Sequence, residues 1–97
     1  MSIYAQTDKH GITRHFIQES GSWDDFPNIV NKVQQSLDTS VVEQVDGPDA
    51  RLCILLVEGH EIAFVHDDMF GNFFFSRDMD AKEAIRAISV LFSGPSN

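Results

Sequence analysis

The tightest polar cluster in the sequence is His66-Asp67-Asp68, which combines side-chain types that often bind metals or move protons. These residues could hold a divalent cation, or one carboxylate could orient the imidazole as a general base. Adjacent residues of a strand point to opposite faces, however, and a metal site usually needs three or more convergent ligands. The simpler interpretation is a histidine that ends a strand and precedes an acidic turn. A small metal- or ligand-binding enzyme that uses these three residues is kept as an alternative hypothesis.

The other reactive side chains are scattered along the chain. His60 and His66 share a strand face but lie roughly 20 Å apart, too far for a shared metal. Cys53 is the only cysteine, so the chain has no intrachain disulfide, and its apolar neighbours indicate an inert buried thiol. The sequence contains no Gly-x-Ser-x-Gly elbow and no glycine-rich phosphate loop. We therefore predict a protein that is not an enzyme and has no metal or cofactor.

The aromatic stretch from Phe70 to Phe75 superficially resembles the strand on which RNA-recognition sheets stack bases. Acidic residues precede this stretch where a basic residue is expected, and few residues are left after the last helix for a further strand. Seven Lys and Arg against fifteen Asp and Glu give a formal charge of −8, which repels phosphate groups. We predict that the chain binds neither nucleic acid nor membranes, and that its charge suits a basic partner.

Two helices must position these residues. Apolar residues recur at three- and four-residue steps from Trp23 to Leu37, and Pro27 places the start of that helix nearer Asp24 or Asp25 than Ser22, unless residues 23–26 form a separate tight turn. The second helix is expected from about Asp80 to Phe92.

Between the helices the hydrophobic period changes to two, which is typical of strands. Strands are expected at 41–45, 51–57, 61–66 and 72–76, with short reversals that make them antiparallel. A further strand is expected at 12–17, and residues 3–6 are a possible strand that pairs with it. The sequence therefore predicts an α+β two-layer sandwich, with an antiparallel sheet of four to six strands and two helices in the order β(β)-α-β-β-β-β-α.

The 97 residues are enough for one domain, 1–97, with loose ends expected at 1–11 and 94–97. The longest apolar run, 52–57, is far shorter than the roughly 20 residues that a membrane span needs. The first residues lack the pattern of a secretory signal. We therefore expect a cytoplasmic protein.

Strand parity indicates an interaction surface. Phe73 and Phe75 point to one face of their strand and Phe74 points to the other, and neighbouring strands are also apolar on both faces. Two helices can cover only one face, so the opposite face is either an interface or is closed by curvature and N-terminal residues. The candidate interaction surface comprises Phe70, Phe73, Phe74, Phe75, Asp67 and Asp68.

Three short stretches carry a family resemblance: Trp23-Asp24-Asp25-Phe26-Pro27, Val41-Val42-Glu43 and Val57-Glu58-Gly59. In these residues the chain resembles a small uncharacterised gammaproteobacterial family, a domain of unknown function, over roughly residues 23–75. The resemblance implies a bacterial cytosolic domain and transfers no catalytic or binding residue.

These observations predict a small acidic, non-enzymatic protein–protein interaction domain, whose partner is a second copy of the chain or a basic protein. A sharper alternative is an acidic inhibitor or immunity-type protein that neutralises a basic toxin or nucleic-acid enzyme, because its charge would steer such a partner.

Overall fold

The computed structural model describes residues 2–93. In that range the elements are β1 (Ser2–Thr7), β2 (Thr13–Gln18), α1 (Asp25–Ser36), β3 (Thr39–Asp46), β4 (Ala50–Val57), β5 (His60–Asp67), β6 (Gly71–Phe75) and α2 (Lys82–Ser93). The strands form one antiparallel open sheet in the order β1-β2-β6-β5-β4-β3. The predicted α+β class with two helices is confirmed, and the sheet has six strands where four to six were predicted.

Local hairpins build most of this sheet. Glu58 and Gly59 both have positive φ, 54° and 88°, which forms the tight two-residue turn that joins β4 to β5. The strand expected at 3–6 is present as β1, in unbroken register with β2, so this part of the expected loose end at 1–11 is ordered. Residues 94–97, the other expected loose end, lie outside the described residues.

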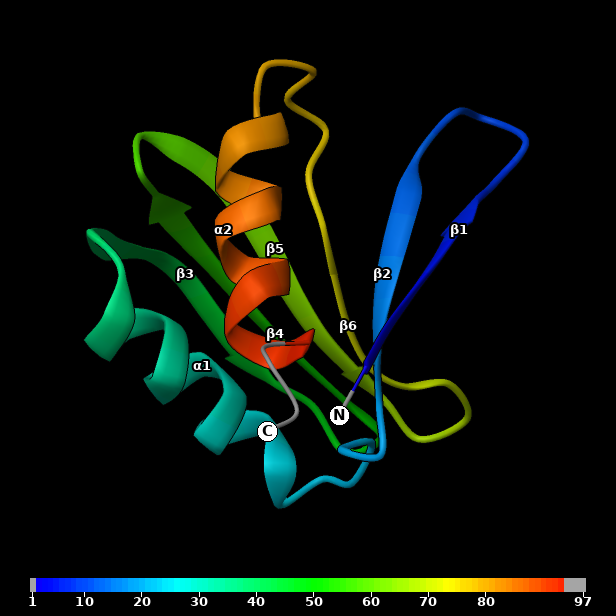
Figure 1. The fold of residues 1–97 in the computed structure, drawn as a ribbon. Helices are drawn as coiled ribbons and strands as arrows, with labels where there is room; N and C mark the ends of the chain where they lie inside the picture. Colours follow the sequence, from blue (N-terminus) through cyan, green and yellow to red (C-terminus); the bar gives the residue numbers. More distant parts are fainter. Residues whose placement is uncertain (1, 94–97) are drawn as a thin grey trace.

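Both helices lie on the same face of the sheet (Figure 1). The apolar stripe of α1 buries Phe26, Ile29, Val30 and Val33 against it. The stripe of α2 buries Ala84, Ile88 and Phe92. Within residues 2–93, neither helix is long and apolar enough to cross a membrane.

A tight turn precedes α1. The Ser22 hydroxyl accepts a hydrogen bond from the Asp25 amide at 3.1 Å, and the Asp25 carboxylate accepts one from the Ser22 amide at 3.4 Å. The helix begins at Asp25, close to the predicted position, but Asp24 makes no side-chain capping bond. The turn covers residues 22–24 and leads directly into α1, so residues 25 and 26 of the separate turn considered at 23–26 belong to the helix. Ser22 supplies the oxygen that accepts from the Asp25 amide.

The second helix begins at Lys82, two residues after the predicted start at Asp80. The intervening residues form a turn in which the Ala81 amide donates to the Asp78 carbonyl at 3.1 Å. The Asp78 carboxylate accepts from the Asp80 amide at 2.9 Å and lies 2.8 Å from His60 Nδ1. Asp78, more than Asp80, therefore organises the approach to α2.

Candidate interaction surface

The two faces of the sheet differ in burial. Along β5, residues 62, 64 and 66 face the helices and are buried, whereas 61, 63, 65 and 67 face away and are partly or fully exposed. The same alternation runs along β6. Within residues 2–93, no element covers the second face, so its apolar side chains contact solvent.

This second face is called the open face below. The strand registers assign these apolar side chains to it: Tyr4, Phe16, Val45, Leu52, Ile54, Leu56, Ala63, Val65, Phe73 and Phe75. Six of them form one row that crosses every strand of the sheet, in the order Tyr4, Phe16, Phe73, Val65, Leu52, Val45. Tyr4 and Val45, at the two ends of this row, are 52% and 48% exposed. An unbroken apolar row of this length is unusual on a face in contact with water.

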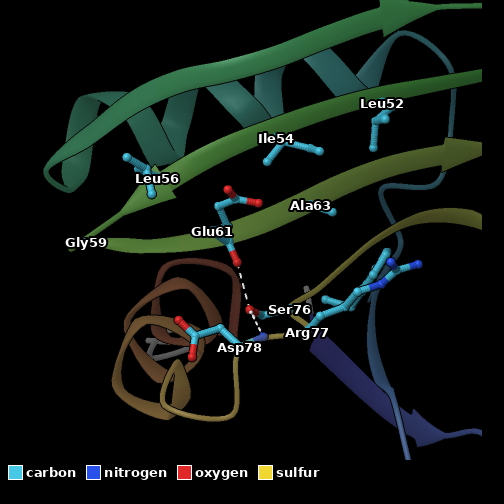
Figure 2. Close-up of a pocket in the computed structure, with 10 residues that line it drawn as sticks. Leu52, Ile54, Leu56, Gly59, Glu61, Ala63, Ser76, Arg77 and Asp78 are labelled. Carbon is cyan, nitrogen blue, oxygen red and sulfur yellow. Dashed lines mark hydrogen bonds between the residues drawn. The ribbon is translucent and has the colours of Figure 1, made fainter. Parts of the chain in front are cut away.

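A ridge and a groove lie side by side on the open face. The ridge consists of Phe73 and Phe75 on β6, whose ring centroids are 6.4 Å apart. The groove, of about 590 Å³, has Ile54 and Ala63 among its apolar lining residues (Figure 2). Ala63, the directly opposed neighbour of Phe75, has a small side chain and so leaves room beside that ring.

Charged side chains border the groove. Glu61 and Arg77 both line it, and the Arg77 side chain turns away from Glu61 (Figure 2). Arg14, on β2, lies with its guanidinium carbon 5.6 Å from the centre of the Phe75 ring. An apolar floor with charges of both signs at its border is a common anatomy for protein interfaces.

The Arg14 guanidinium donates to the Asp8 carboxylate at 2.6 Å, and the amide of Ile12 donates to the same side chain. These bonds, that of Arg14 above all, lower the pKa of Asp8 from the usual 3.8 to about 2. A lowered pKa in the folded state means that the carboxylate stabilises the fold above pH 3.8. This contribution is lost as the pH falls from 3.8 towards 2.

The variant Arg14→Gln is therefore expected to raise the pKa of Asp8 towards 3.8, because the strongest of these bonds is removed. An NMR titration of the Asp8 side-chain carboxyl measures this pKa directly. Lys32→Gln, a matched charge removal on α1, should leave it unchanged. An unaltered pKa of Asp8 in Arg14→Gln would contradict the assigned cause.

The predicted surface residues divide into two groups. Asp67, Phe70 and Phe73 line one hollow on the open face, and Phe75 on the ridge lines the neighbouring groove. The Asp67 carboxylate accepts from the amides of residues 69 and 70, which shapes the loop that carries Phe70.

Phe74 and Asp68 do not belong to this surface. Phe74 is fully buried, stacked on His15 at 5.1 Å and packed against Phe64. No partner can reach it in the folded protein, so the prediction that Phe74 belongs to the surface is wrong. Successive side chains of a strand point to opposite faces, so Phe74 points towards the helices while Phe73 and Phe75 point to the open face. Asp68 lies beside His66, away from Phe73 and Phe75.

The structure does not bring His66, Asp67 and Asp68 into one site. His66 is 2% exposed and faces the helices, whereas Asp67 faces the opposite side of the sheet. Asp68 extends into solvent, with one carboxylate oxygen 3.2 Å from His66 Nε2. Across residues 2–93, no three His, Cys, Asp or Glu side chains are placed to hold a metal ion. Cys53 is buried, and burial raises the pKa of its thiol.

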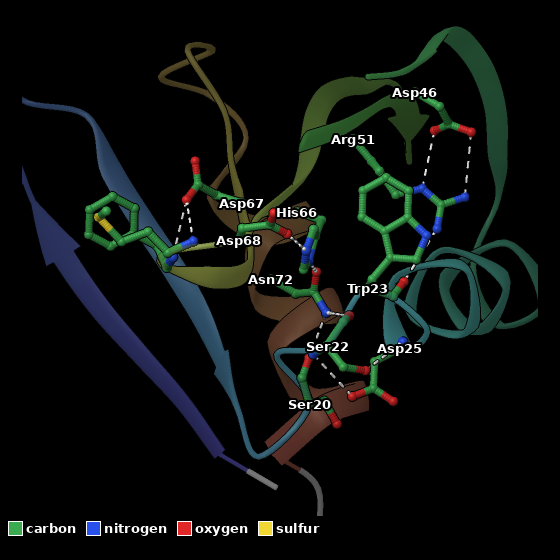
Figure 3. A network of polar contacts seen from close by, with 12 residues as sticks. Ser20, Ser22, Trp23, Asp25, Asp46, Arg51, His66, Asp67, Asp68 and Asn72 are labelled. Carbon is green, nitrogen blue, oxygen red and sulfur yellow. Dashed lines mark hydrogen bonds and ion pairs between the residues drawn. The ribbon is translucent and has the colours of Figure 1, made fainter. Parts of the chain in front are cut away.

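His66 instead belongs to a buried polar network with Asn72 (Figure 3). The Asn72 amide nitrogen donates to the backbone carbonyls of Ser20 and Ser22 at 2.7 and 3.0 Å. Its side-chain oxygen must then accept from His66 Nδ1, at 2.8 Å. The network ties the β5–β6 hairpin to the segment that leads into α1.

Trp23 connects this network to β3 and β4. Its ring meets the His66 ring edge-on, with the ring centroids 5.4 Å apart, and the Arg51 guanidinium lies 4.5 Å from the indole centre (Figure 3). Arg51 also donates to the Trp23 carbonyl and to the Asp46 carboxylate. Sequence reasoning missed Asn72, Trp23 and Arg51 as one unit, because their contacts join distant parts of the chain. The network positions the segment before α1 against the β5–β6 hairpin and against β4.

No family model, curated protein or solved structure matches this chain.

Proposed function

We propose that this chain is a non-enzymatic protein–protein interaction domain that docks through the open face. The observation that carries the proposal is the apolar row that crosses all six strands, over which no other part of residues 2–93 packs. Leaving such a row in water costs free energy in proportion to its apolar area, so a partner that covers it gains that free energy. A ridge, a groove and a charged border give the partner shape and charge to recognise.

A nucleic acid is a poor match for the same face. Aromatic rings on an open sheet can stack bases, but the phosphates that accompany the bases need surrounding positive charge. Here Glu43, Glu61 and Asp67 lie on the open face with Arg14, and the chain as a whole carries a charge of −8. A protein surface can pair with both signs of charge, whereas phosphate cannot.

A photo-crosslinking amino acid in place of Phe75 tests the proposal in cells of the natural host. Irradiation is expected to give covalent protein adducts from position 75. Position 90 on α2 is the matched control, because Val90 is 60% exposed on the helical side and should give none. Adducts that form equally at both positions, or at neither, would refute docking through the open face. The mass of an adduct also reports whether the partner is a second copy or another protein.

A further inference from the structure

We infer that the partner is a second copy of this chain, packed open face to open face about a two-fold axis that runs parallel to the strands between β5 and β6. The inference rests on the proposed function and specifies which partner covers the open face. This axis lies in the interface between the two copies, above the seam of β5 and β6 at the middle of the six-stranded sheet. It places β6 over β5 of the partner, β2 over β4 and β1 over β3, so every strand is covered.

The first support is the composition of the apolar row. On one side of the proposed axis it consists of aromatic residues, Phe73, Phe16 and Tyr4. On the other side it consists of aliphatic residues, Val65, Leu52 and Val45. The rotation sets each aromatic side chain over an aliphatic one of the partner subunit. Large side chains thus meet smaller ones, as in well-packed layers of a protein core.

The second support is the match between ridge and groove. Phe75 and Ala63 are direct neighbours across the β5–β6 pair, one on each side of the proposed axis. The rotation therefore places Phe75 over Ala63 of the partner subunit, and the reciprocal contact forms by symmetry. Each ridge enters the groove of the other copy, which would otherwise hold water.

The third support is charge. Ser76 donates to the Glu61 carbonyl at 2.7 Å, which keeps the chain beyond β6 beside β5 and brings Arg77 to the same groove as Glu61. Within the described residues, no ion pair joins Arg77 or Glu61 to a neighbour. The rotation brings Arg77 towards Glu61 of the partner subunit, and the two-fold symmetry produces this contact at two places in the dimer.

An axis that runs across the strands fits less well. Such an axis would stack β5 on β5 of the partner subunit with the two strands running in opposite directions. Asp67 would then lie against Glu61 of the partner subunit. Like charges would then face each other at both ends of the contact. The parallel axis avoids this repulsion.

The size of the face suits a modest dimer. Six strands spaced about 4.8 Å apart, with about six residues along each, span roughly 29 by 20 Å, or about 600 Å² per copy. Twice that area is about 1,200 Å², the lower end of the range for specific interfaces. We expect dissociation in the micromolar range.

Sedimentation velocity over a range of protein concentrations tests the geometry through a charge exchange. Arg77→Glu and Glu61→Arg are each expected to raise the dimer dissociation constant roughly tenfold, because two attractive contacts become repulsive. The double variant with both changes should restore dissociation to within about threefold of the wild type. Arg86→Glu on α2 is the matched control and should leave it unchanged. Val65→Asp, at the centre of the apolar row, should give a monomer with native circular dichroism.

The possible results separate the two levels of the proposal. If Val65→Asp yields monomers but the double charge variant shows no restoration, the open face is an interface and the proposed axis is wrong. If the dimer survives Val65→Asp, both the axis and docking through the open face are wrong. A wild-type chain that stays monomeric at all concentrations refutes the second copy as partner, and the crosslink from position 75 then decides the proposed function independently.

Discussion

Phe74→Ala is expected to lower the free energy of unfolding by about 3–5 kcal/mol, the usual loss when a buried phenylalanine is truncated. The ring is fully buried between His15 and Phe64 under the helices, so its removal leaves a cavity as well as losing apolar contacts. Chemical denaturation at low protein concentration measures this loss without a contribution from association.

Phe73→Ala is the matched control because it removes the same side chain from the neighbouring position on the other face of β6. Phe73 is only partly buried, so we expect less than half of the loss seen for Phe74→Ala. Its main effect should be on association, which sedimentation velocity detects. Equal losses of stability from the two variants would mean that the open face is covered within the monomer, contrary to the fold described above.

Asn72→Ala is expected to lower the free energy of unfolding by about 2–4 kcal/mol, because it removes both donors to the carbonyls of Ser20 and Ser22 and the acceptor for His66. Asn72→Asp should cost at least as much, although its shape is nearly unchanged. It places a carboxylate oxygen where a donor must face two carbonyl oxygens. Asn31→Ala, on the exposed side of α1, is the control and should change stability by less than about 0.5 kcal/mol.

The single tryptophan reports on the same site. Trp23 contacts both His66 and Arg51, so loosening of the network should shift its fluorescence in Asn72→Ala even where the fold is retained. If Asn72→Ala and Asn31→Ala were equally stable and equally fluorescent, the network would not hold the segment before α1.

Much of the fold follows from local patterns in the sequence. The period-two stretches between the helices and the Glu58-Gly59 turn predict β3 to β6 as consecutive hairpins, and these elements are present. The pairing of β2 with β6 could not be predicted in this way. It depends on contacts between residues nearly sixty positions apart, such as Phe16 and Phe73, for which no local signal exists.

The interaction surface was predictable only in part. Strand parity separates Phe74 from Phe73 and Phe75, but it does not say which face the helices cover. That choice depends on how α1 and α2 close over the sheet. The Asn72 network was hidden for another reason: an asparagine within an aromatic strand has no neighbour in sequence that indicates its hydrogen-bond partners, which are carbonyls some fifty residues earlier.

The seam between β2 and β6 has a consequence for how the chain assembles during synthesis. β3, β4, β5 and β6 can pair one after another as they leave the ribosome, because each strand meets its neighbour across a short turn. The β1–β2 hairpin is made earlier, yet its sheet partner β6 is the last strand to emerge. Residues 13–18 therefore have no strand partner on their β6 side until residues 71–75 have been synthesised. Neither β1 nor β2 contains a long apolar run, which limits the apolar surface that the unpaired hairpin exposes and so its tendency to aggregate.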